Sequence, residues 1–151
     1  MIGASGLAYL SLWYEIYIHL TSIGEAVEII DWKSRLNCCK YDANVGIRIA
    51  RLAGDGGFAT YLTVIDPGQS VTPHYHASGD EHYHILSGAG EVSLYDRVAN
   101  TAQTAPVSEQ QSFVVNANTV HCLKNTGAEP LVLMFSCPES HLQQDRHFPQ
   151  A

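Results

Sequence analysis

The chain has 151 residues, of which 46% are hydrophobic and 15% are charged, so it predicts one folded domain with a single core. Its formal net charge is −7, and its eight lysines and arginines are scattered along the sequence. This argues against a nucleic acid as partner, because binding a polyanion requires a concentrated basic surface.

The first twenty residues, MIGASGLAYLSLWYEIYIHL, are apolar enough to suggest a signal peptide or a membrane anchor. Against this, no basic residue precedes the apolar stretch, Glu15 interrupts it, and it is short for a membrane span. We therefore expect no membrane partner. Two interpretations stay open: an additional element that packs on the domain, or an extension from an upstream start codon.

Residues 22–34 have mixed polarity and predict either a short helix or an edge strand. We therefore treat residues 1–44 as an N-terminal extension, with a short helix or strand packed on the domain. The four cysteines show neither the spacing of a zinc ribbon nor that of a disulfide framework. Reduced thiols and a cytoplasmic location are the expectation.

From Val45 onward the sequence is typical of β-structure. Short runs rich in β-branched and aromatic residues alternate with turn signals such as GDGG at 54–57 and DPG at 66–68. Close spacing of this kind indicates a sandwich or barrel. The predicted strands are 45–52, 58–65, 71–76, 81–86, 89–95, 101–107, 112–115, 119–124 and 131–136.

The stretch GQSVTPHYHASGDEHYHILSG at 68–88 holds four of the eight histidines. His74 and His76 are two residues apart, so on a strand they project from the same face. The ASGD sequence that follows can turn the chain so that Glu81 lies opposite them. Imidazole and carboxylate together suit a divalent first-row metal, and His121 on a later strand is the candidate fourth ligand.

The spacing of these residues resembles a known family. Gly68, five residues, His74, one residue, His76, four residues, Glu81, six residues and Gly88 match the first cupin motif in full. Asp80 is an alternative carboxylate, ranked second because it breaks the spacing to the last glycine.

The second cupin motif ends in a histidine followed after three residues by an asparagine. The sequence HCLKN supplies these as His121 and Asn125. The family also has a glycine and a Pro-x-Gly before the histidine, and this chain has Gln110, Asn116 and Asn118 there. The departure concerns turns and not ligands, and asparagine is the next-best residue after glycine for left-handed backbone.

The resemblance covers roughly residues 46–137 and implies an all-β fold, a single cupin β-barrel of jelly-roll type over 45–137. Residues 138–151 would form a C-terminal tail. It also implies one divalent metal ion (Fe, Mn, Ni or Zn) inside the barrel. The implied ligands are His74, His76, Glu81 and His121. Cupins commonly pair, so we expect a homodimer or larger assembly.

The function is predicted at the level of reaction class only, since a fold does not fix a function. We favour a metal-dependent enzyme that acts on a small molecule with dioxygenase-like chemistry. One alternative is a sugar-phosphate isomerase or epimerase, or a lyase. Another is a non-catalytic module that binds or senses a small molecule.

Strand alternation assigns roles to the neighbours of Glu81. His82 and His84 have the opposite parity and should point away from the site. Tyr83 and Ile85 share the parity of Glu81, which makes Tyr83 a candidate pocket residue, with core packing as the alternative. Arg48 and Tyr61 are further candidates for the pocket whose facing the sequence leaves open.

Overall fold

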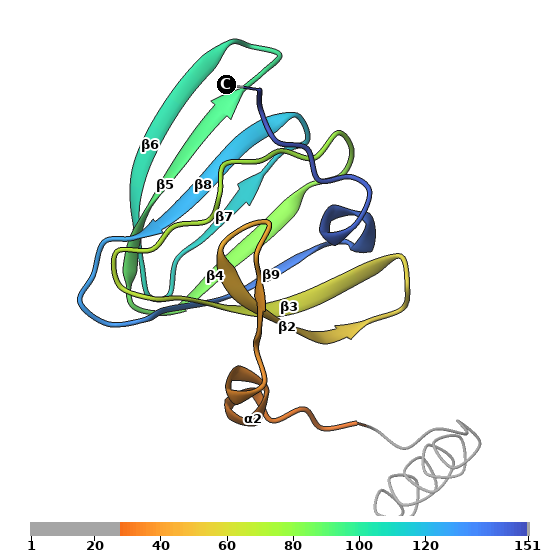
Figure 1. Cartoon of the computed structure of the whole chain (residues 1–151), viewed down its shortest axis with the longest axis vertical. Helices are drawn as coiled ribbons and strands as arrows, with labels where there is room; N and C mark the ends of the chain where they lie inside the picture. Colours follow the sequence, from red (N-terminus) through yellow and green to blue (C-terminus); the bar gives the residue numbers. More distant parts are fainter. Residues whose placement is uncertain (1–27, 151) are drawn as a thin grey trace, which may run out of the picture.

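The computed structural model describes residues 28–150, which form two antiparallel sheets (Figure 1). The larger sheet contains, in spatial order, β1 (Lys40–Asp42), β2 (Ile47–Gly54), β3 (Phe58–Ile65), β9 (Leu131–Pro138), β4 (Glu81–Ser87) and β7 (Ser112–Val115). The smaller sheet contains β6 (Thr101–Ser108), β5 (Ala89–Asp96) and β8 (Thr119–Asn125). The prediction of an all-β fold is confirmed.

The two sheets are the walls of one barrel, and the core lies between their inner faces (Figure 1). Buried and more exposed residues alternate along β4, β8 and β9, as expected of strands with one face inward. The inner faces contribute Ile47, Val92, Leu123, Leu133 and Phe135, among others.

One predicted strand forms differently. Residues 71–76 make only isolated bridges, in which His74 pairs with His121 and Tyr75 with His147. The segment is extended, but its two neighbours lie on different parts of the chain, so no continuous ladder develops. His74 and His76 are still buried, at 5% and 3% exposure.

The turns that frame the histidines adopt left-handed backbone. Gly68 and Gly88 have φ values of 76° and 89°, and a Cβ atom on Gly88 would lie 2.8 Å from the backbone oxygen of Pro130. Gln110 and Asn118 stand where the cupin pattern has glycine, and their φ values are 68° and 63°. The departures from the second motif therefore keep the turn geometry that glycine usually provides.

The N-terminal part of the described chain contains helix α2 (Trp32–Asn37) and strand β1. The Asp31 side chain caps the helix by accepting a hydrogen bond from the Lys33 backbone N–H at 3.0 Å. The helix lies against β2 and β3. For residues 22–34 the sequence left a short helix or an edge strand open; the structure has a helix that begins at Trp32.

The prediction for residues 1–20 lies outside the described residues. No helix within 28–150 is long and apolar enough to cross a membrane.

Residues 139–150, which we call the C-terminal strap, fold back onto the barrel. The strap begins with the 3-10 helix η1 (Glu139–Leu142) and then runs alongside the segment that precedes β4 (Figure 1). Tyr75 and His147 exchange two backbone hydrogen bonds, of 2.9 and 3.0 Å. The predicted tail is thus an ordered part of the domain that reaches the histidine cluster.

Candidate metal centre

The structure brings together the four side chains that the sequence singled out. His74 and His76 come from the segment before β4, Glu81 begins β4, and His121 lies on β8. The nearest ligand atoms of the three histidines lie within 4.8 Å of one another. Oxygens of Glu81 lie 3.4 Å from Nε2 of His76 and 3.3 Å from Nε2 of His121. All four residues are at most 5% exposed.

Each of the three histidines has its Nδ1 next to a backbone carbonyl oxygen. The acceptors are Thr72 for His74 at 2.7 Å, Asp145 for His76, and Thr119 for His121 at 3.1 Å. A carbonyl can only accept, so each ring carries a hydrogen on Nδ1, and Nε2 is the nitrogen that faces the cluster. The Nε2 atoms of His76 and His121 are buried without a hydrogen-bond partner within the described residues. Buried unpaired nitrogens of this kind fit a metal ion.

The charge states also fit a metal ion, because its ligands must be neutral imidazoles and an ionised carboxylate. Burial lowers the pKa of His74 to about 3 and that of His76 to about 4, so both rings are neutral at pH 7. Burial alone would raise the pKa of Glu81. Its interactions with His121 and His141 outweigh burial and hold the pKa well below the usual value.

The sequence analysis missed His141, which is fully buried in η1. Its Nδ1 lies 3.2 Å from Oε1 of Glu81, and its Nε2 lies 2.7 Å from the backbone oxygen of Ser78. Both neighbours accept hydrogen bonds, which favours a protonated ring. Burial lowers the pKa of His141, but these two bonds outweigh burial and raise it overall. His76, Glu81 and His141 form a second group whose ligand atoms lie within 4.8 Å.

Tyr83 lies at the cluster, as the parity of β4 predicted. Its hydroxyl donates a hydrogen bond of 2.6 Å to Oε2 of Glu81, and its ring stacks on Phe113 with centroids 4.7 Å apart. Burial and the neighbouring carboxylate raise the pKa of Tyr83 well above its usual value, so the hydroxyl keeps its proton. Tyr83 therefore holds Glu81, whereas Ile85 belongs to the core.

The other polar residues next to Glu81 in the sequence lie away from the cluster. His82 and His84 are exposed on the opposite face of β4, as predicted. Asp80 is also exposed, and its carboxylate accepts a hydrogen bond from the Ala117 backbone N–H at 3.1 Å. Glu81, and not Asp80, is therefore the carboxylate at the cluster.

Two further candidates do not line the pocket. Arg48 pairs with Asp66 at the surface, with 2.7 Å between nitrogen and oxygen. Its neighbours Ile47 and Ile49 point inward, so strand parity turns Arg48 outward. Tyr61 is buried and stacks on Phe135 with centroids 5.1 Å apart, and so it serves the core.

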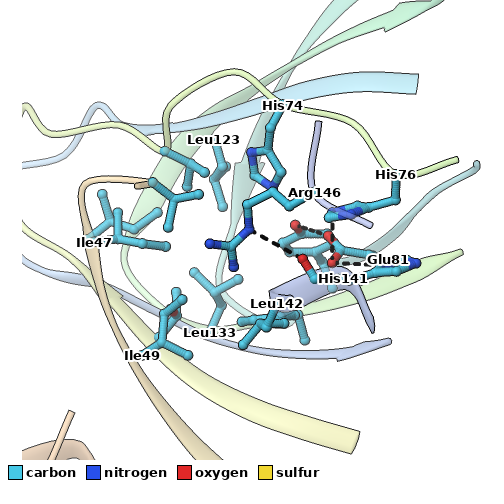
Figure 2. Close-up of a pocket in the computed structure, with 16 residues that line it drawn as sticks. Ile47, Ile49, His74, His76, Glu81, Leu123, Leu133, His141, Leu142 and Arg146 are labelled. Atoms are coloured by element: carbon cyan, nitrogen blue, oxygen red, sulfur yellow. Dashed lines mark hydrogen bonds and ion pairs between the residues drawn. The ribbon is translucent and has the colours of Figure 1, made fainter. Parts of the chain in front are cut away.

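A small pocket opens next to the cluster; its cavity volume is about 30 Å³, and it is partly open to solvent. Figure 2 shows Glu81, His76 and His141 at one side and aliphatic side chains over much of the remaining wall. The strap contributes Leu142 and Arg146 to this lining. The pocket thus combines a polar cluster with largely apolar walls, which is typical of small-molecule sites.

Comparison with known proteins identifies the family. A family model described as "Cupin domain" matches residues 61–137, about half of the chain. The chain belongs to the cupin family. The cupin motifs and the predicted barrel are thereby confirmed. Cupin membership and the cluster of histidines and glutamate together make metal binding the expectation for this site.

One curated protein resembles this chain over part of its length. It is 33% identical over 81 residues to mannose-1-phosphate guanylyltransferase RfbM of Salmonella typhimurium, covering 54% of this chain and 16% of that protein. The chain thus spans about a sixth of that relative's length.

Two solved structures share the fold. One is a Klebsiella pneumoniae protein with a double-stranded beta-helix domain, with TM-score 0.60 and 14% identity, covering 75% of this chain and 90% of the other. The other is the protein TT1209 of Thermus thermophilus, with TM-score 0.60 and 20% identity, covering 74% of this chain and 97% of the other. Identities this low show the fold alone.

Proposed function

We propose that this cupin is a metal-dependent enzyme that acts on a small molecule with dioxygenase-like chemistry. It would hold one divalent ion, Fe, Mn, Ni or Zn, through His74, His76, Glu81 and His121. The observation that supports this best is the pair of buried, unpartnered Nε2 atoms beside an ionised carboxylate. Three nitrogen ligands and one oxygen ligand would leave positions on such an ion for dioxygen or a substrate carbonyl.

The protein's own groups would orient these ligands. The three backbone carbonyls fix the ring orientation of the histidines through Nδ1–H. Tyr83 donates to one oxygen of Glu81, and His141 holds a proton at Nδ1 beside the other. The aliphatic wall of the pocket excludes water from the substrate, which protects reactive chemistry and strengthens polar contacts.

A sugar-phosphate isomerase or epimerase is the second candidate. The 33% identity to a mannose-1-phosphate guanylyltransferase favours it, although the chain covers only 16% of that protein. The aliphatic pocket wall argues against it, because a polyhydroxylated sugar needs hydrogen-bond partners along its length. A lyase, or a module that binds without turnover, would use the same metal site.

Elemental analysis of protein purified without added metal tests the metal site. We expect one divalent ion per chain, and the double variant H74A/H76A should retain none. The double variant H82A/H84A is the matched control, since it removes two histidines of the same spacing from the outer face. Full metal content in H74A/H76A, or equal loss in both variants, would refute the assignment. Dioxygen uptake by the iron-loaded protein would then separate an oxygenase from a metal-assisted isomerase or a binding module.

A further inference from the structure

Arg146 enters the pocket from the C-terminal strap. Its side chain is 7% exposed, although the guanidinium stays charged at any physiological pH. Nε donates to the backbone oxygen of His141 at 3.3 Å, and Nη1 donates to Oδ2 of Asp42 at 2.8 Å. Within residues 28–150, no protein atom accepts a hydrogen bond from Nη2. The Nη2 edge of this largely buried guanidinium reaches the open side of the pocket, where a ligand can accept from it.

The surroundings of that edge are apolar. Figure 2 shows the guanidinium among Ile47, Leu133 and Leu142, with Glu81, His76 and His141 to one side. Arg146 is the only arginine or lysine among the described residues that line the pocket. A cation in an aliphatic pocket binds an anionic oxygen group strongly, because little water competes for it.

We propose that Arg146 binds the carboxylate of the substrate, so that the substrate is a small aliphatic carboxylate with its reacting end at the metal. This inference rests on the proposed metal site, because the ion would hold the other end of the molecule. The aliphatic wall between the two polar ends matches a short hydrocarbon segment better than a chain of hydroxyl groups.

The subsite that would bind the anion belongs to the strap and not to the part of the barrel that matches the cupin family. Residue 146 lies beyond residues 61–137, which match the cupin domain. The strap is held in place by its own contacts, since the Asp145 carboxylate accepts hydrogen bonds from the backbone N–H groups of Ala77 and Ser78. Arg146 is thus a specificity-determining residue that the barrel motifs do not encode.

Calorimetric titration of the manganese-loaded protein tests this with matched pairs of ligands. Malonate, succinate and glutarate are compared with propionate, butyrate and valerate, which have the same chain lengths and one carboxylate fewer. At least one dicarboxylate should bind about ten- to a hundredfold more tightly than its partner, as expected for a charge-assisted hydrogen bond. In Arg146→Gln this preference should fall to about twofold or less.

Two further variants separate recognition from folding. Asp42→Asn removes the charge that competes for the guanidinium, so dicarboxylate affinity should rise. A purely structural role for the Asp42–Arg146 pair would instead make both variants weaker binders, and that result would overturn the proposal. Arg48→Gln is the control, because it breaks a surface ion pair of the same kind outside the pocket and should preserve the preference.

Metal content is measured for every preparation. A wild-type protein that retains no metal contradicts the proposed function. A fully loaded wild type without any dicarboxylate preference contradicts the Arg146 proposal alone. 3-Phosphonopropionate replaces one carboxylate of succinate by a phosphonate, and tighter, Arg146-dependent binding of this ligand would overturn the choice of a carboxylate in favour of a phosphate-type group.

Discussion

The imidazole ring of His141 stacks on that of His76, with centroids 3.9 Å apart and 4° between the planes. At the same time its Nδ1 lies 3.2 Å from Oε1 of Glu81. One residue of the strap therefore contacts two of the proposed metal ligands, through the ring face and through the ring edge. The strap and the ligand set form one packed unit.

His141→Gln should lower metal affinity while leaving the four proposed ligands in the sequence. The change removes the stack on His76 and the contact with Glu81, and outer-sphere partners of this kind typically contribute about ten- to a hundredfold to metal affinity. Competition with a chelator of known affinity measures the effect. His84→Gln is the matched control, as it alters an exposed histidine that pairs with Ser112 and not with a ligand. Equal affinities for the two variants would exclude the role given to His141.

The proposed ligands were predictable because their spacing is local. His74, His76 and Glu81 lie within eight residues, where strand parity and one turn decide which side chains meet. His121 needed a motif as well as parity. His82 and His84 were correctly placed outward by the same alternation.

His141 and Arg146 could not be found in this way. They follow the last strand, in a segment without periodicity or a cupin motif, and their positions depend on contacts with distant parts of the chain. Arg146 pairs with Asp42, and His141 with Glu81. Pairings so far apart in sequence leave no local pattern, so the structure alone showed that the predicted tail reaches the site.

Tyr83→Phe should destabilise the metal-free protein by about 1–3 kcal/mol, because a buried carboxylate oxygen loses its hydrogen-bond donor. The ring, and with it the stack on Phe113, is kept. Urea unfolding of the metal-free protein measures the change. Tyr61→Phe removes a hydroxyl from a buried tyrosine outside the pocket and serves for comparison. The role of Tyr83 as a support for Glu81 would be lost if the two variants were equally stable.

Asp145→Ala should release the strap. The Asp145 carboxylate accepts hydrogen bonds from the backbone N–H groups of Ala77 and Ser78 and from the Ser78 hydroxyl, and its backbone oxygen contacts Nδ1 of His76. We expect faster amide hydrogen exchange in 139–150 together with weaker metal binding. Asp96→Ala breaks a similar turn, between β5 and β6, and should leave metal binding unchanged. Unaltered metal affinity in Asp145→Ala would show that the strap does not support His76.

Self-association stays a prediction, and the sheet edges provide its test. Among the described strands, β7 pairs only with β4, so one edge of β7 is open, and Val114 on this strand is 46% exposed. If this edge mediates the expected homodimer, Val114→Lys should shift it to monomer in light scattering, because an edge lysine opposes strand pairing. Val98→Lys changes a more exposed valine in a turn and should have no effect. A wild-type monomer at high micromolar concentration would rule out the dimer.

Acid should destabilise the metal-free protein through His74 and His76. Their folded-state pKa values of about 3 and 4 lie below the ordinary value of 6.5. Between pH 6.5 and 4 the unfolded chain therefore binds protons that the folded chain does not, and stability falls as pH decreases. At pH 5 the loss should reach about 2 kcal/mol for each histidine. The raised pKa of His141 acts in the opposite sense, since its stabilising contribution is largest at low pH. Urea unfolding at pH 7 and at pH 5 measures how much unfolding free energy is lost between the two pH values. This loss is compared between the wild type and His74→Gln. The wild type should lose more stability than the variant, and equal losses would mean that His74 is not held neutral by burial.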